Sequence, residues 1–126
     1  MSTSLARRAA AVSFGLRIAF GVGLLAAPSK LTEPWLGSEA ASAPAQVPLR
    51  ALGTREIVIN GLAMAAWVAD APLRPWLVGG LAGDLTDVVA TLAGRRQLPD
   101  RSASLILAVG GAAALANGAI AVAVES

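Results

Sequence analysis

The chain contains no cysteine and no histidine. The absence of cysteine excludes disulfides, thiol catalysis and thiolate metal sites. The absence of histidine removes the commonest general acid/base and the commonest metal ligand. Any proton chemistry must therefore use a carboxylate, or a water molecule perturbed by an arginine.

Charged residues are also scarce, at 14% of 126 residues, whereas 56% are hydrophobic. A soluble domain carries about a quarter charged residues, and a core of this size cannot bury so much Ala, Val, Leu and Ile. The net charge of +2 comes from basic residues scattered over predicted helix ends and loops. Since they form no extended stripe, we expect contact with lipid headgroups and no nucleic-acid partner.

The apolar runs predict four membrane-spanning helices, near residues 9–27, 50–69, 75–93 and 102–124. Each is close to the roughly 20 residues that a bilayer requires. Short connections between such spans are typical of an antiparallel bundle. The sequence therefore predicts an all-α, integral membrane four-helix bundle, a multi-pass protein of the cell membrane with the lipid bilayer around it.

The segment 28–49 is expected to lie outside the hydrocarbon because it contains four prolines. Within it, residues 29–36 can form a short interfacial helix, with Trp35 at headgroup level. The first apolar run also fits a secretory signal peptide loosely, but Arg17 in its middle argues against that alternative. The basic residues near the span ends favour placing both termini outside.

Five charged residues lie inside the apolar runs, namely Arg17, Arg55, Glu56, Asp84 and Asp87. A charge near the bilayer centre costs about 2.5–3.5 kcal/mol on insertion scales, so it persists where it is paired, hydrated or useful. Two arginines against three acids leave a formal charge of −1, and Arg50 at a helix start brings it to zero. We therefore expect a self-neutralising polar interior.

Helical spacing groups the polar residues into faces, because residues at i, i+4, i+7 and i+11 lie on one side. The third span gives the series Gly80, Asp84, Asp87 and Thr91. The second gives Glu56, Asn60, Ala63 and Trp67. The first and fourth add Ser13, Arg17 and Gly21, and Gly110, Ala114, Asn117, Gly118 and Ala121. Gly79 with Gly83, and Gly110 with Ala114 and Gly118, have the spacing of small-residue packing contacts.

The candidate catalytic residues are Asp84, Asp87 and Glu56. Two like charges on one face favour a shared proton, which suits acid/base catalysis and proton-coupled transport. Arg55 is expected to form a direct salt bridge with at least one of these three acids. Glu56, close to both Arg55 and Arg50 in the sequence, is expected to be the fixed partner of an arginine. In the structural alternative, Arg17 and Arg55 merely satisfy the acids, and the charges only specify packing.

The neighbouring polar and aromatic side chains are candidate ligand-binding residues: Arg17, Arg50, Arg55, Asn60, Trp67 and Asn117. A carboxylate-only Mg²⁺ or Ca²⁺ site is conceivable, but the nearby arginines disfavour it. The glycines lack phosphate-loop spacing. We therefore expect no metal and no cofactor.

The stretch Arg50-Ala-Leu-Gly53-Thr-Arg55-Glu56-Ile-Val-Ile-Asn-Gly61, followed by Gly83-Asp84-Leu-Thr-Asp87, resembles small four-span bacterial membrane proteins of unknown function. In size and helix count the chain is also similar to the DoxX-like group. The resemblance implies a four-helix bundle and points to the same charged residues. It implies no established activity.

Three function classes fit these patterns. The first is a membrane enzyme or binding protein that takes a lipophilic small molecule between its helices and uses the carboxylates as acid/base. The second is a small proton-coupled transporter, which requires a homo-oligomer because four helices leave little room for a channel. The third is an accessory subunit of a membrane complex with purely architectural charges. The one-sided acid pair beside arginines and Trp67 favours the first class.

Overall fold

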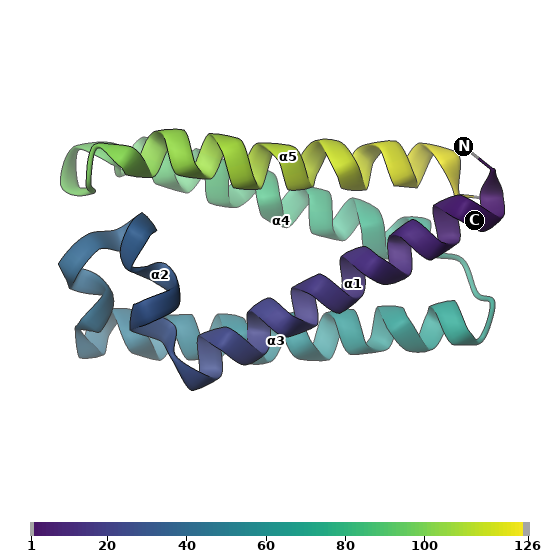
Figure 1. The fold of residues 1–126 in the computed structure, drawn as a ribbon, viewed down its shortest axis with the longest axis horizontal. Helices are drawn as coiled ribbons and strands as arrows, with labels where there is room; N and C mark the ends of the chain where they lie inside the picture. The colour runs from purple at the N-terminus through teal and green to yellow at the C-terminus, as the bar shows by residue number, and fades with distance from the viewer. Residues whose placement is uncertain (1, 125–126) are drawn as a thin grey trace.

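Long α-helices make up most of the structure, a computed structural model that describes residues 2–124 (Figure 1). The four long helices are α1 (Thr3–Ala26), α3 (Ala43–Val68), α4 (Arg74–Ala93) and α5 (Arg101–Ala123). The shorter elements are α2 (Pro28–Leu36) and the 3₁₀ turns η1 (Gly37–Ala41) and η2 (Arg95–Gln97). The part of the chain that the structure describes has no strand. The predicted all-α class and the short helix within the 28–49 segment are confirmed.

The largest difference from the predicted bounds is the start of α3. Residues 43–49 were expected to belong to the linker, but α3 begins at Ala43. The backbone N–H of Ala45 donates to the Ser42 Oγ at 3.3 Å, which caps the helix. Pro44 lies in the first turn, where a proline removes no helical hydrogen bond. Pro48, one turn later, removes one such bond without ending the helix.

Three of the long helices, α1, α4 and α5, are long and apolar enough to cross a membrane. Large apolar side chains point outward from them, including Leu16, Val89 and Leu115, which are 67%, 67% and 78% exposed. In α3 the polar residues near its middle interrupt the apolar run, and α3 is not among these candidate spans. The four-span arrangement therefore stays a prediction.

The long helices form two antiparallel pairs, α1 with α3 and α4 with α5 (Figure 1). Helix α1 crosses diagonally, so that its first half reaches α5 near both termini while its second half lies on α3. Along their lengths, α3 makes few contacts with α4 or α5. The two layers are therefore joined mainly at their ends and through α1.

The closest helix crossing joins α1 and α3 at two glycines. A Cβ added at Gly21 would lie 2.7 Å from the carbonyl oxygen of Gly53, and a Cβ at Gly53 would lie 2.7 Å from that of Gly21. Only glycine permits this backbone contact. The predicted contact through Gly79 and Gly83 is wrong, because both residues are exposed and the space beside them is open.

The hydrophobic core lies at the end of the molecule that holds the described termini. Its buried members come from α1, α3, the α3–α4 turn, α4 and the end of α5: Ala6, Ala10, Phe14, Ala63, Leu73, Leu77, Ile120, Ala121 and Val124. No comparable apolar cluster fills the middle of the described molecule. The middle must therefore be held by polar contacts or by the helix crossing.

Arginines near the helix ends bind carbonyl oxygens at the C-terminal ends of neighbouring helices. The acceptors are Trp67 and Ala71 for Arg7, Ala121 and Val124 for Arg74, and Glu33 and Pro34 for Arg101. The last carbonyls of a helix have no intrahelical partner, and the negative end of the helix dipole favours a cation there. Three basic residues predicted to contact headgroups thus hold the helix ends together.

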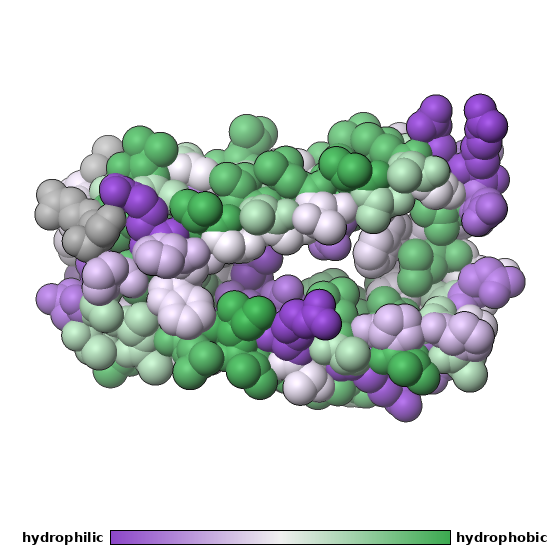
Figure 2. Space-filling model, turned by 180° about the vertical axis from the view of Figure 1, so that it is seen from behind, coloured by the Kyte–Doolittle hydropathy of each residue, from purple (hydrophilic) through white to green (hydrophobic). Residues whose placement is uncertain are grey.

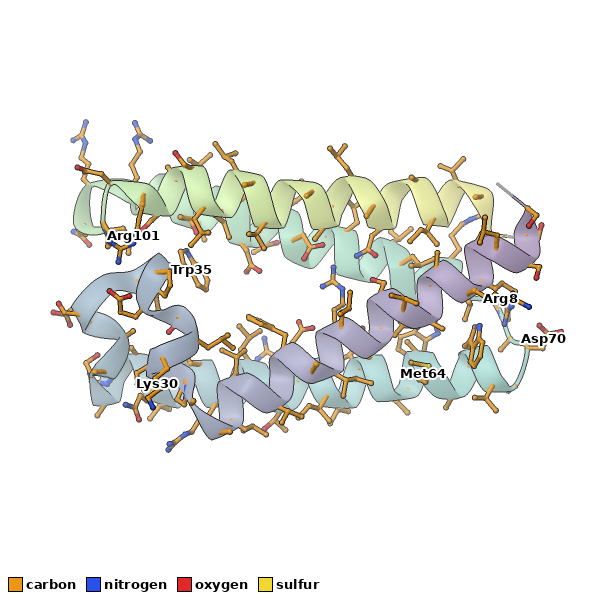
Figure 3. The ribbon with its side chains drawn as sticks, viewed as in Figure 1. Arg8, Lys30, Trp35, Met64, Asp70 and Arg101 are labelled. Carbon is orange, nitrogen blue, oxygen red and sulfur yellow. The ribbon has the colours of Figure 1, made fainter. Side chains whose placement is uncertain are left out.

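Helix α2 closes the opposite end by docking onto α4 and α5. The indole N–H of Trp35 donates to Thr91 Oγ1 at 3.0 Å, and the Ser102 hydroxyl donates to the backbone carbonyl of Trp35. Figure 3 shows Trp35 between α2 and the α4–α5 layer. Trp35, predicted to sit among headgroups, therefore fastens the two layers.

Candidate ligand site between the helix layers

An open space separates the two helix pairs in the middle of the molecule. Because α3 does not pack along α4 or α5, the layers diverge between their joined ends. Figure 2 shows a hollow between the layers, with hydrophilic side chains visible inside it. Polar residues of the predicted interior, from α1, α3 and α4, lie near one another in this part of the molecule.

Arg17 and Asp84 form the ion pair that bridges the layers. The Arg17 Nη2 donates to the Asp84 Oδ2 at 2.5 Å, and the two side chains are only 18% and 11% exposed. Arg17 reaches α4 because α1 runs diagonally between the layers. Asp84 lies near the middle of α4, so this is the polar contact farthest from either end of that helix.

Asn117 and Ser13 extend the ion pair into a network that joins α1, α4 and α5. The Ser13 hydroxyl donates to Asn117 Oδ1 at 2.9 Å, and Asn117 Nδ2 donates to Asp84 Oδ2 at 3.5 Å. A Cβ at Gly80 would lie 3.1 Å from Asn117 Nδ2, so glycine leaves room for the amide. Ser13 was not a candidate site residue, although its spacing of four from Arg17 was the available signal.

Glu56 and Asp87 border the same space without an ion pair. Glu56 Oε2 accepts a hydrogen bond from Asn60 Nδ2, 3.1 Å away on the same helix. The Asp87 side chain forms no hydrogen bond or ion pair with the rest of residues 2–124, and both acids are half-buried. Glu56 lies within electrostatic range of Arg17, Asp84 and Asp87. Acids from α3 and α4 thus share the field of one arginine.

The predicted salt bridge between Arg55 and one of the three acids is wrong. Arg55 and Arg50 are exposed, and neither forms an ion pair within the described chain. Residues 55 and 56 point about 100° apart on a helix, so turning Glu56 inward turns Arg55 out. Arg17 is the interior arginine instead, because α1 is the helix that crosses between the layers.

The sequence predicts a self-neutralising interior, and this prediction is wrong for the cluster that the structure shows. One arginine faces three carboxylates, Glu56, Asp84 and Asp87, which gives the cluster a formal charge of −2 when all are ionised. Trp67, a predicted ligand-binding residue, packs against the hydrophobic core near the termini. The structure brings together six of the predicted site residues: Arg17, Glu56, Asn60, Asp84, Asp87 and Asn117. Arg50, Arg55 and Trp67 lie outside this cluster.

Within residues 2–124, no three acidic side chains are close enough to hold a metal ion. The carboxylates of the cluster come from opposite layers, and one is already bound to a guanidinium. The arrangement gives no support to the carboxylate-only cation site considered from the sequence.

No family model, curated protein or solved structure matches the chain. The likeness to small four-span membrane proteins stays a prediction.

Proposed function

We propose that the chain is a multi-pass membrane protein that binds a lipophilic small molecule in the hollow between its two helix layers. The membrane location is supported by three helices of spanning length and composition and by the apolar side chains on their outer faces. Helix α3 would be the fourth span, since it lies antiparallel against α1. An opening between helices would admit a ligand from the lipid phase.

The observation that carries this proposal is the pair of half-buried carboxylates, Glu56 and Asp87, that border the hollow without an ion pair. Ionisable residues inside a membrane usually pair with one another or line a site or pathway. In the proposed site these acids exchange a proton with the bound molecule. Arg17 and Asp84 keep the layers in place. The polar atoms would orient a ligand whose apolar part lies in the hollow.

Membrane location is tested first, with single-cysteine variants in a chain that has no other cysteine. Leu85 is exposed near the middle of α4. Leu85→Cys in intact membranes should resist a charged, membrane-impermeant thiol reagent. A cysteine placed at Ser38, on the exposed 3₁₀ turn η1, is the reactive control in membranes opened to both sides. Labelling at position 85 as fast as at position 38 would contradict the membrane location.

Ligand access is tested with a long-chain alcohol that carries an alkyl diazirine, photolysed in the presence of the purified protein. We expect the probe to label Glu56. Labelling should fall to background in Asp87→Trp, where the indole fills the hollow. Val89→Trp is the matched control, because Val89 is exposed on the same helix. Equal labelling of Glu56 in both variants, or none in the wild type, would refute the binding site.

A further inference from the structure

We infer that the outer face of α3 binds a partner transmembrane helix that carries an aspartate or glutamate at the level of Arg55. The inference rests on the proposed membrane location, and it is independent of the proposed ligand site. It goes beyond that site, because the residues concerned face away from the hollow.

The first observation is the depth of Arg55. Gly53, two residues earlier, touches Gly21 at the α1–α3 crossing. Gly21 is one helical turn from Arg17, which pairs with Asp84 near the middle of α4. Helices α1 and α3 are antiparallel, so the two steps run in the same direction, and at 1.5 Å per residue Arg55 lies about 3 Å from the level of Arg17. An exposed guanidinium at this level lies inside the hydrocarbon of any bilayer that α4 spans.

No group of the described chain neutralises Arg55 there. Asp84 is bound to Arg17, and Glu56 turns toward Asn60 and the hollow. In a hydrocarbon core of about 30 Å, the nearer headgroup layer begins roughly 12 Å beyond the level of Arg55. Arginines that reach headgroups lie near helix ends. A carboxylate on a neighbouring helix would be a partner at the right level.

The second observation is the shape of the surrounding face. Exposed small and β-branched residues recur on α3 at alternating intervals of three and four: Val47, Ala51, Thr54, Val58, Gly61, Ala65 and Val68. This is the spacing of a helix–helix seam. Small residues let two backbones approach closely in lipid, and the space beside Gly61 is open. Arg55 follows Thr54 and points about 100° away from it, so it lies at the flank of this seam, where charged residues form interhelical salt bridges.

A second copy of the chain does not fit this surface. The exposed acids of residues 2–124 lie in end segments: Glu33, Glu39, Asp70 and Asp100. None of them lies at the level of Arg55. A two-fold pairing of α3 with itself about the middle of the seam would bring like charges together, which is unfavourable. Charge complementarity therefore selects a different helix that brings its own acid.

The probe for this surface is a synthetic leucine–alanine transmembrane peptide with one central glutamate. The full chain, labelled at a cysteine in place of Arg96 in η2, is placed in phosphatidylcholine vesicles with the labelled peptide. When position 55 is arginine, energy transfer between the labelled chain and the labelled glutamate peptide should show that the two associate. It should fall to the level of a central-glutamine peptide when Arg55→Gln is introduced. Arg55→Glu should restore association with a central-lysine peptide.

Matched seam variants separate a specific surface from general attraction. Gly61→Leu should weaken binding of the glutamate peptide, whereas Gly83→Leu, in an open position on α4, should not. Equal binding of the glutamate and glutamine peptides would overturn the inference. Energy transfer between copies of the chain, if it were lost in Arg55→Gln, would also overturn the inference. Arg55-dependent binding of anionic lipid in place of the peptide would overturn it as well. Failure of the membrane location would already be visible as labelling of Leu85→Cys, and failure of the ligand site would leave these results unchanged.

Discussion

The surroundings of Asp84 and Asp87 differ sharply, although the two residues lie three positions apart on one face of α4. Asp84 is 8% exposed, pairs with Arg17 and accepts from Asn117. Asp87 is half-buried and has no such partner within residues 2–124. Helical spacing gives both residues the same direction, but the diagonal path of α1 brings a guanidinium to only one. Asp84 therefore joins the layers, whereas the Asp87 side chain has no such contact within residues 2–124.

The largest expected effect is the loss of the Arg17–Asp84 pair. Removing one partner leaves an unpaired charge in a low-dielectric interior, which typically costs about 3–5 kcal/mol. We expect Asp84→Asn and Arg17→Ala each to lower the free energy of unfolding by an amount in this range. Chemical or thermal unfolding in detergent micelles measures it.

A double-mutant cycle of Arg17→Ala and Asp84→Ala separates this pair from independent effects. The double variant should recover part of the loss, because neither charge is then left alone. Strictly additive losses would show that the 2.5 Å contact does not couple the two residues. Asp84 would then not differ from Asp87 in stabilising the contact between the helix layers.

The next effect concerns the glycine crossing that sets the path of α1. Gly53→Ala would place a Cβ 2.7 Å from a backbone oxygen and 2.9 Å from the Leu24 Cβ, so the helices must separate. Overpacking of this kind costs about 1–3 kcal/mol. Gly61→Ala is the control on the same helix, since nothing lies within 4 Å of its new methyl group. Equal melting temperatures for the two variants would show that the contact between Gly21 and Gly53 does not set the path of α1.

A smaller effect is expected at the end of the molecule that holds the hydrophobic core. Arg74 donates to the carbonyl oxygens of Ala121 and Val124 at 2.8 and 2.6 Å. Cations at a helix C-terminus stabilise by about 0.3–1 kcal/mol, so Arg74→Ala should lose a similar amount. Hydrogen exchange should accelerate in the last turn of α5. Arg96→Ala, an exposed change in η2, should leave exchange there unaltered.

Much of the architecture followed from local patterns. The apolar runs located α1, α4 and α5. Helical spacing placed four residues on one face of α4, and all four are buried or half-buried in the structure: Gly80, Asp84, Asp87 and Thr91. The start of α3 could not be predicted in this way, because a proline pattern that suggests a linker is also tolerated in the first turns of a helix.

The identity of the interior arginine was beyond sequence reasoning for a different reason. Arg17 and Arg55 both lie in apolar runs, and both could in principle reach an acid. The choice depends on the direction in which α1 crosses α3, and the backbone contact of Gly21 with Gly53 fixes that crossing. Such a contact joins residues far apart in the chain. The sequence around each glycine does not indicate the contact before the two helices are placed together.

The smallest expected stability effect is the most informative about function. Asp87→Asn keeps the size of the side chain and removes a charge that no ion pair uses within residues 2–124. Its melting temperature should stay near that of the wild type, within the about 0.5 kcal/mol typical of substitutions outside special contacts. If Asp87 exchanges a proton, infrared spectra should lose a titrating carboxyl band in Asp87→Asn. Asp84→Asn should keep that band in the fraction that folds. A fall in stability as large as that of Asp84→Asn, with the carboxyl spectrum unchanged, would instead assign both aspartates to architecture.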